Sequence, residues 1–340
     1  MPELKGGERL DLYLVRLGWA ASRRAAREMV ASGGVHVNGR RYRKGELVGP
    51  GDHVDVVAAT PSATIAPNSD LWVETLYEDS AVLVVNKPGL IPCHPLRPDE
   101  RDTVMNSVVA AYPETAIAGD KPLEGGLVHR LDNGTSGALI IARTNEAFAM
   151  MRDAIRHGRV VRRYQALALG SIDKPCEIAS PIAHHPKNVR KMVAIDLGHS
   201  EGPMRPVDGG ARHADGGIRH AGGGMRHIAG ATRRYDNGRP AATMVEPLEH
   251  IGAFTLISVI PRTGRRHQVR VHLASMNHSL AGDELYGGPA LEGLAPGRFW
   301  LHLAHLGFDS PAGGRVEAEA PLPADLRAAL ERCAQIRRTR

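Results

Sequence analysis

The stretch GGLVHRLDNGTSGALIIAR, residues 125–143, constrains the fold more than any other part of the chain. It begins and ends with apolar runs that are typical of buried strands, the clearer one being ALII at residues 138–141. Between the runs lie His129, Arg130 and Asp132, followed by Asn-Gly-Thr-Ser-Gly, a sequence with turn chemistry. The stretch therefore predicts a charged loop held between two core strands.

Asp132 has three interpretations at this point. It could cap the turn through Asn133, which is a common use of an aspartate before Asn-Gly. It could form an ion pair with Arg130 or with another arginine, or it could be a nucleophile or base at the end of a core strand. From this stretch alone the two structural interpretations are favoured, because turns closed by an Asp side chain are so frequent.

A second stretch, PRTGRRHQVRVHLASMNHSLAGDELYGG at residues 261–288, concentrates positive charge. Gly264 predicts a turn, and the sequence after it is typical of the start of a helix or of a short strand. On a helix, Arg266 and Arg270 would share a face. Such a cluster suits phosphate binding, and one buried arginine would suit pairing with a carboxylate, whereas a generic basic loop is the alternative. The four arginines of the cluster are Arg262, Arg265, Arg266 and Arg270.

Basic residues also gather near the N-terminus. The chain has a net charge of +6, and residues 1–50 contain ten Lys/Arg against five Asp/Glu. Two helical patterns, the second with Ser22 as its expected cap, precede the alternating segments VHVNG and GDHVDVV. This favours a small RNA-binding module over a merely solvated surface. The residues predicted to contact RNA on its exposed edge are Arg23, Arg24, Arg27, Arg40, Arg41 and Lys44.

A chain of 340 residues predicts two domains. The small, polar and Pro-containing segment AATPSATIAPNSD indicates a linker between them. In the larger domain strands dominate and do not alternate regularly with helices, so the predicted fold class is α+β with a mixed, largely antiparallel sheet. The predicted organisation is a small domain at 1–57, a linker at 58–70, a large domain at 71–330 and a basic tail at 331–340.

Three tandem heptads, GGARHAD, GGIRHAG and GGMRHIA, occupy Gly209 to Ala229. On a helix their histidines, His213, His220 and His227, would align as metal ligands. Paired glycines oppose a helix, at a cost of about 1 kcal/mol each relative to Ala. The repeats are therefore interpreted as part of a flexible Gly/Arg/His-rich insertion at 198–240, and no metal site is predicted.

Cysteine usage and hydropathy bear on the compartment. Cys93, Cys176 and Cys333 lie far apart with no CxxC pair, which argues against a disulfide framework and a zinc site. Cys93 lies beside His94 but is interpreted as a spare thiol in a reducing compartment. The N-terminus lacks the pattern of a signal peptide, and no window approaches the ~18 apolar residues of a membrane helix. We therefore expect a cytoplasmic protein with no membrane association.

Together these stretches resemble the signature motifs of the RluA-type pseudouridine synthases, in the family's order. The resemblance rests on VHRLDNGTSGALIIAR, RRYQALALG and PRTGRRHQVRVHLASMNHSLAGDELYGG, and it extends from about LYEDSAVLVVNKPG to APLPADL. The N-terminal module resembles the S4 RNA-binding domain, with VHVNG matching that family's strand signature. His129 and TGRRHQVR favour the RluA type over its sister group, in which Gly typically precedes the Arg-Leu-Asp triplet.

The resemblance implies an isomerase with a central cleft that converts uridine in RNA to pseudouridine without a cofactor or metal. The C1′–N1 bond breaks, the base rotates, and C5 joins C1′. The resemblance implies that Asp132 is the catalytic carboxylate, that Arg270 pairs with it and keeps it ionised, and that Tyr164 packs on the base and can accept a proton. Arg130 is expected to enter the RNA helix as the target base is flipped out. The further residues expected to contact RNA are His129, Arg262, Arg265 and Arg266.

The implied substrate is ribosomal RNA of the large subunit, with other structured RNA as an alternative, and we expect a monomer. Two other classes remain: a non-catalytic RNA-binding ribosome-assembly factor and a metal-dependent RNA hydrolase that uses the histidine repeats. The combination of Asp132, Tyr164 and Arg270 argues against the first, because a binding module does not need all three. Departures from the family pattern blur the subfamily and the target uridine, and they are Cys93, Ser279, Leu303 and Ser310.

Overall fold

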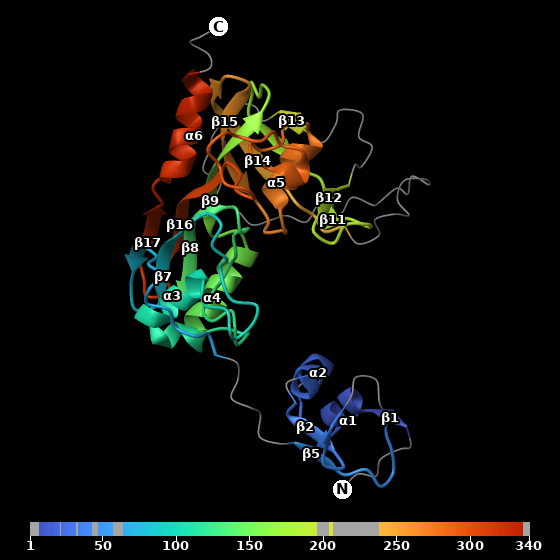
Figure 1. Ribbon diagram of the computed structural model, residues 1–340. Helices are drawn as coiled ribbons and strands as arrows, with labels where there is room; N and C mark the ends of the chain where they lie inside the picture. Colours follow the sequence, from blue (N-terminus) through green and yellow to red (C-terminus); the bar gives the residue numbers. More distant parts are fainter. Residues whose placement is uncertain are drawn as a thin grey trace. The chain divides into compact units, whose positions relative to one another are not determined.

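The computed structural model of the chain consists of two compact units, Met1–Thr64 and Ile65–Arg340, called the small and the large unit below (Figure 1). The structure describes residues 7–20, 22–31, 33–42, 47–56, 64–195, 204–206 and 238–335. Ile65 is buried in the core of the large unit, and the Asn68 N–H donates to the Asn106 carbonyl at 2.9 Å. The predicted linker at 58–70 therefore extends too far, because residues from Ile65 onward pack on the large unit.

The small unit combines two helices with short antiparallel strands. Leu10 and Leu14 lie in its core, as the helical pattern predicts, and the Ser22 hydroxyl accepts from the Ala25 N–H at 3.2 Å as the expected cap. Its three-stranded sheet has the order β3-β2-β5, and β1 pairs with β4. Its elements are β1 (Glu8–Arg9), α1 (Leu10–Arg16), α2 (Arg23–Ala31), β2 (Val35–Val37), β3 (Arg40–Arg41), β4 (Leu47–Val48) and β5 (Val54–Val56).

The large unit is built on a ten-stranded sheet of order β13-β10-β14-β15-β9-β16-β8-β7-β6, with β17 also paired to β16. Among the described strands only β8 and β16 pair in parallel, which confirms the predicted α+β class with a mixed, largely antiparallel sheet. A separate hairpin joins β11 (Ile182–His184) to β12 (Met192–Ala194). The strands of the main sheet are β6 (Thr75–Glu78), β7 (Val82–Lys87), β8 (Ser136–Ala142), β9 (Val161–Leu169), β10 (Cys176–Ile178), β13 (Met204–Pro206), β14 (Thr243–Ile251), β15 (Phe254–Pro261), β16 (Leu301–Asp309) and β17 (Arg315–Glu319).

Strand β16 lies in the middle of the sheet, and its pairing partners change along its length. The first residues of β16 pair with β8, through His302 with Ser136 and Leu303 with Gly137, whereas its later residues pair with β17. Gly137 has φ +121°, and a Cβ there would collide with the Leu303 backbone, so only glycine permits this close parallel pairing. As a result, the loop that enters β8 lies at the centre of the large unit.

The helices of the large unit lie beside the two halves of this sheet, α3 and α4 near β7 and β8, and α5 near β14 (Figure 1). Thr103 caps α3, and Thr144 caps α4 by accepting from the Ala147 N–H at 3.1 Å. The side chain of Asn145, the first residue of α4, accepts from the Gly119 N–H at 2.9 Å. The helices are α3 (Val104–Ala111), α4 (Asn145–Arg156), α5 (Gln268–Ser275) and α6 (Ala324–Gln335), with short 3-10 turns η1 (Pro113–Ala116) and η3 (Glu284–Tyr286).

Two predicted boundaries change at the edges of the large unit. Helix α6 continues to Gln335 and buries Cys333, so the predicted tail cannot begin at residue 331. Within the predicted insertion at 198–240, β13 (Met204–Pro206) pairs with β10, and Arg239 forms a bridge with Ile182. The heptads at Gly209–Ala229 lie outside the described residues. None of the described helices is long and apolar enough to cross a membrane.

The segment before the charged loop differs from the predicted strand. It forms a single bridge, between Leu127 and Ile141, instead of a ladder. The reason is His129, whose ring Nε2 accepts from the Ile140 N–H at 3.1 Å and so takes the place of a backbone carbonyl. The prediction of two core strands around the loop is therefore right for β8 only.

Candidate active site

A cavity of about 590 Å³ opens at the centre of the large unit, beside the loop that precedes β8. Its wall includes Asp132 from this loop, Tyr164 from β9 and Arg270 from α5. The three residues predicted to be catalytic, which are far apart in the sequence, thus line one cavity. The cavity has the size of a small-ligand site.

The backbone that follows Asp132 is held by a buried lysine. Lys87, fully buried at the end of β7, donates from Nζ to the carbonyls of Pro88 at 2.8 Å, Asn133 at 3.1 Å and Thr135 at 2.7 Å. Burial lowers the pKa of Lys87 to about 8. The turn itself is closed by the backbone, because the Thr135 N–H donates to the Asp132 carbonyl at 3.0 Å. The Asp132 carboxylate is therefore not needed to hold the turn.

Arg298 holds the same segment through Gly134 and Ser136. Its buried guanidinium donates to the Gly134 carbonyl, to the Ser136 hydroxyl at 2.8 Å and to the Phe299 carbonyl at 3.1 Å. Sequence reasoning missed both Lys87 and Arg298. The available signal was a lysine at the end of the apolar strand VLVVNKPG, since a charge there must be buried and needs partners.

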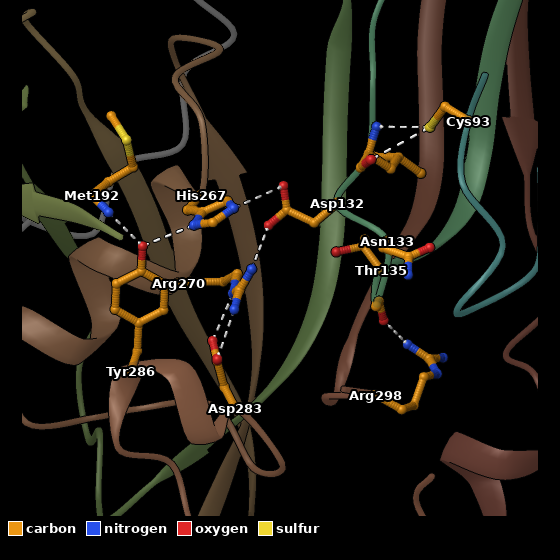
Figure 2. A network of polar contacts seen from close by, with 12 residues as sticks. Cys93, Asp132, Asn133, Thr135, Met192, His267, Arg270, Asp283, Tyr286 and Arg298 are labelled. Atoms are coloured by element: carbon orange, nitrogen blue, oxygen red, sulfur yellow. Dashed lines mark hydrogen bonds and ion pairs between the residues drawn. The ribbon is translucent and has the colours of Figure 1, made fainter. Parts of the chain in front are cut away.

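Arg270 connects two carboxylates (Figure 2). Its Nη1 donates to Asp132 Oδ2 at 3.0 Å, while its Nε and Nη2 form a two-pronged contact with Asp283 at 2.7 and 2.8 Å. The guanidinium is packed between the rings of Phe299 and Tyr286, with its carbon 4.2 and 5.0 Å from the ring centroids. Asp283 is buried, whereas the Asp132 side chain is 24% exposed, so Arg270 is anchored on one side and presents Asp132 to the cavity on the other. Asp283 lies in the motif AGDELYGG, but the sequence alone predicts no role for it.

His267 faces the second carboxylate oxygen of Asp132 (Figure 2). Its Nε2 is 3.9 Å from Asp132 Oδ1, and its Nδ1 is 2.8 Å from the Tyr286 hydroxyl. Its backbone is left-handed, with φ +56°, a conformation that costs a residue other than glycine about 1–3 kcal/mol. Burial lowers the pKa of His267, and the nearby Asp132 carboxylate partly opposes this shift. The ring is therefore neutral at neutral pH.

Tyr164 forms part of the cavity wall and is only 8% exposed. Burial raises the pKa of its phenol to about 12, and the Asp132 charge adds to the shift. Burial therefore favours the protonated phenol, and the proton-accepting role that the family resemblance implies stays a prediction. Packing against a flat base is the role that its position supports.

The rim of the cavity is basic. Arg130 is 62% exposed, 3.9 Å from Glu124, and Arg265 and Arg266 also line the opening. Arg262 is exposed but does not line it. Arg266 precedes α5, which begins at Gln268, so it does not share a helical face with Arg270 as predicted. The backbone turns at His267 before the helix starts.

His129 lines the cavity, but its side chain is almost fully buried. Its ring is buried and accepts the Ile140 N–H, and burial, with a smaller contribution from the Arg162 charge, lowers its pKa to about 3. A neutral ring committed to the backbone has no charge to offer a phosphate. The structure therefore gives His129 a structural role in holding the charged loop against β8.

In the small unit, three arginines converge on the buried Asp11. Arg9 Nε, Arg23 Nη2 and Arg27 Nε lie 3.0, 3.4 and 2.9 Å from its carboxylate oxygens, and each of these arginine side chains stays about half exposed. The hydrogen bond from Arg9, followed by that from Arg27, lowers the pKa of Asp11 to about 2 against the opposing effect of burial. The exposed residues of β3 are Arg40 and Arg41. Lys44 and the side chain of Arg24 lie outside the described residues.

Cys93 also lines the cavity but is not an activated thiol. Its sulfur lies 3.4 Å from both the N–H and the carbonyl of Leu131, and burial raises its pKa. A protonated, buried thiol is a poor nucleophile. Within the described part of the chain no cluster of three or more His, Cys, Asp or Glu side chains could hold a metal ion.

Comparison with known proteins assigns both units to families. Residues 81–275 match the family model described as RNA pseudouridylate synthase, and residues 8–54 match the S4 domain. The chain is 31% identical to an RNA pseudouridine synthase of Chloroflexus aurantiacus, over 97% of this chain and 91% of the relative. It is 30% identical to the ribosomal large subunit pseudouridine synthase D of Yersinia pestis, over 83% of this chain and 74% of the relative.

Solved structures share the fold. The human RNA pseudouridylate synthase domain containing 1 superposes with a TM-score of 0.52 at 24% identity, covering 81% of this chain and 98% of the human chain. The human RNA pseudouridylate synthase domain containing 4 gives a TM-score of 0.54 at 22% identity, covering 76% and 92%. At this level of identity the likeness concerns the fold.

Proposed function

The chain belongs to the RNA pseudouridylate synthase family, and we propose that it isomerises specific uridines of large-subunit ribosomal RNA, with Asp132 as the catalytic carboxylate. The observation that carries the proposal is the position of Asp132: it lines the cavity, its side chain is 24% exposed, and one of its oxygens is held by the buried Arg270. Relatives named ribosomal large subunit pseudouridine synthase D support the choice of substrate. Action on ribosomal RNA fits the cytoplasmic location and the monomer that we expect.

The proposed reaction starts with a flipped-out uridine in the cavity. A base stacked in a helix cannot reach Asp132, so the nucleotide must leave the stack, and Arg130 on the rim is placed to fill the space that it vacates. Tyr164 provides the flat, apolar surface against which the uracil packs. The rim arginines Arg265 and Arg266 contact the flanking phosphates.

Asp132 acts at the ribose in one of two ways, and both require the same arrangement of side chains around its carboxylate. Its carboxylate either attacks C1′ and forms an ester, or takes the proton from C2′ and leaves a C1′–C2′ double bond. In both cases the electron pair of the C1′–N1 bond leaves with the uracil. Arg270 holds the Asp132 carboxylate in position for this step, through the hydrogen bond from its Nη1 to Oδ2. The reaction is an isomerisation and needs no cofactor.

Asp132→Asn tests the proposal, since the change keeps the shape of the side chain and removes its charge. Single-turnover formation of pseudouridine should fall by at least ~10³-fold, while RNA affinity stays within about twofold. The target is first mapped by comparing pseudouridines in RNA from cells with and without the protein. Asp309→Asn, at an exposed carboxylate remote from the cavity, is the matched control and should keep the normal rate. Normal activity in Asp132→Asn would refute the assignment of Asp132, and an unchanged pseudouridine map would favour a non-catalytic assembly factor.

A further inference from the structure

His267 carries a hydrogen-bond donor into the cavity that the steps above do not use. The direction of this donor follows from its neighbours. The Met192 N–H donates to the Tyr286 hydroxyl at 2.8 Å and occupies a lone pair of that oxygen. The hydroxyl hydrogen is then free to point at His267 Nδ1, which lies 2.8 Å away. With Nδ1 accepting this hydrogen, the proton of the neutral ring resides on Nε2.

The Nε2–H of His267 lies beside Asp132, the proposed catalytic carboxylate. It lies on the Oδ1 side of Asp132, opposite the Oδ2 that Arg270 holds. The distance of 3.9 Å between Nε2 and Oδ1 is too long for a hydrogen bond, so Asp132 does not consume this donor. The side chain is 11% exposed, which leaves it an opening to the cavity.

The position of the ring is specified by more than one constraint. His267 adopts a left-handed backbone immediately before α5, and its ring meets the Tyr286 ring edge-on, at 5.8 Å and 87°. Strained backbone persists only where its surroundings over-determine it, and it is concentrated at functional sites. The same Tyr286 ring packs on the Arg270 guanidinium, so the donor and the arginine are positioned relative to each other.

We propose that His267 is a further catalytic residue, whose Nε2–H donates to the O2 carbonyl of the target uracil as the C1′–N1 bond breaks. This proposal rests on the proposed function. When the bond breaks, its electron pair passes to N1 and the negative charge spreads onto O2 and O4. Of the two oxygens that share the charge, O2 is the nearer to C1′, where Asp132 acts. A neutral, fixed N–H beside that atom stabilises the charge as it develops.

The later steps balance without His267 changing its protonation. The freed uracil rotates, and C5 bonds to C1′ with an electron pair of the ring. The C1′–carboxylate bond breaks, or the C2′ proton returns from Asp132. The C5 proton then leaves to solvent and N1 takes up a proton. The N–H of His267 donates a hydrogen bond only to the negatively charged uracil that has left the ribose.

Two substitutions at this position separate the donor from the fold. Asparagine tolerates a left-handed backbone, and its amide lies where Nδ1 does, so His267→Asn keeps a partner for Tyr286 but places no donor at Nε2. Glutamine reaches further and carries an N–H near the Nε2 position. On RNA containing the mapped uridine, His267→Asn should lower the single-turnover rate by about 100-fold, and His267→Gln by less than about tenfold. His278→Gln, outside the cavity, is the matched control and should keep the normal rate.

The dependence on the leaving group identifies what the donor does. Fluorine at C5 withdraws electrons and stabilises the detached uracil anion, so RNA with 5-fluorouridine at the target should depend less on His267. Loss of 5-fluorouridine, followed by chromatography of digested nucleosides, should slow by about tenfold or less in His267→Asn, against about 100-fold for uridine. Equal losses of rate on both substrates would overturn the proposal. The N–H would then act by supporting Asp132 or by stabilising the fold.

A double-mutant cycle tests the tautomer. Tyr286→Phe keeps the ring beside Arg270 and removes the hydroxyl, so the proton of His267 is no longer directed to Nε2. The rate should fall severalfold in the otherwise native protein and stay unchanged in the His267→Gln background, because an amide has no tautomers. Equal effects in both backgrounds would contradict the proposal. If Asp132→Asn is inactive while both His267 variants react normally, this inference fails and the proposed function stands. If Asp132→Asn is active, the proposed function fails first.

Discussion

Arg270 is shared by two carboxylates, and this sharing explains how one residue can both hold and activate another. The contact with Asp283 uses two N–H groups and lies in the interior, so it fixes the plane of the guanidinium. The remaining Nη1 then determines the direction of Asp132 Oδ2. Burial by itself would lower the pKa of Arg270, but the two carboxylates more than compensate and keep it charged.

Arg270→Lys should separate this geometry from simple attraction for RNA. Lysine keeps the positive charge but cannot contact Asp283 with two parallel N–H groups and reach Asp132 as well. We expect the single-turnover rate to fall by about 100-fold or more, with RNA affinity nearly unchanged. The free energy of unfolding should fall by about 1–3 kcal/mol, because Asp283 loses part of its hydrogen bonding.

The control for this variant is Arg23→Ala in the small unit, which should weaken binding and leave the chemical step intact under saturating RNA. A phosphate contact at Arg270 would give the opposite result: lysine would sustain the rate, and any loss would appear in the affinity. A normal chemical rate in Arg270→Lys would remove Arg270 from the candidate catalytic residues.

At the residue scale the sequence identified the functional residues that lie within specific motifs. It missed the residues whose roles depend on buried contacts. Asp132, Tyr164 and Arg270 are recognisable because their neighbours form long, specific strings. Asp283 and Lys87 lie in stretches that carry the same resemblance, but their roles depend on which groups they face across the fold. The sequence around such charged residues has no periodicity that would distinguish a buried, paired side chain from an exposed one.

At the element scale the central feature is the approach of β8 to β16, which sets the loop carrying Asp132 in the middle of the sheet. Gly137 is the residue that allows it. We expect Gly137→Ala to destabilise the protein by about 3 kcal/mol or more, because strain from the positive φ adds to a collision with the Leu303 backbone. Denaturant unfolding measures the change.

Gly158→Ala is the matched control for this prediction. Gly158 also has a positive φ, +71°, but an added Cβ there would meet no atom within 4 Å. It should cost only the backbone strain, about 1–2 kcal/mol. Equal losses at the two positions would mean that the sheet can open at β16 without cost and that the parallel pairing does not fix the loop.

His129 fastens the incoming segment to β8 and makes that contact sensitive to acid. Its pKa is about 3 in the folded protein, against 6.5 when exposed. Between these values the unfolded chain binds a proton that the folded one does not, so stability falls as the pH drops below 6.5. From pH 7 to pH 5 the loss due to His129 should be about 2 kcal/mol. His129→Gln, which keeps an acceptor for Ile140 but does not titrate, should reduce the pH dependence by that amount, and parallel stability curves would contradict this account.

Element prediction worked where periodicity and caps were strong. Strand β8, helix α2 and the class of the sheet all follow from local pattern. It failed where a side chain replaced the backbone, as at His129, and where a left-handed residue delayed the start of α5 beyond Arg266. Both failures concern tertiary contacts, and both lie at the candidate site.

At the scale of the whole molecule the charge and the chemistry lie in separate units. The ten basic residues of the N-terminal region belong to the small unit, and the three candidate catalytic residues belong to the large one. Asp11 neutralises part of the positive charge and holds Arg9, Arg23 and Arg27 in fixed positions with their ends half exposed. An ordered set of guanidinium groups loses less entropy on meeting phosphates than free side chains would.

Removing residues 1–63 should therefore weaken RNA binding without abolishing isomerisation. Ile65 and the residues after it pack on the large unit, so this cut spares its core. Each lost phosphate contact should make the plot of log affinity against log salt concentration shallower by about 0.7–0.9. We expect a change of about 2 or more in that slope, with the single-turnover rate at saturating RNA within about tenfold of normal.

The full chain supplies the control that separates charge from fold. Arg40→Glu, at an exposed residue of β3, reverses one charge without touching the Asp11 cluster or the large unit. It should make the plot of log affinity against log salt concentration shallower, by the equivalent of about one or two phosphate contacts. The melting temperature should stay unchanged. If the truncated protein melts as a cooperative unit and both proteins keep the original slope, the arginines of the small unit are a solvated face. RNA would then be held by the rim of the cavity alone.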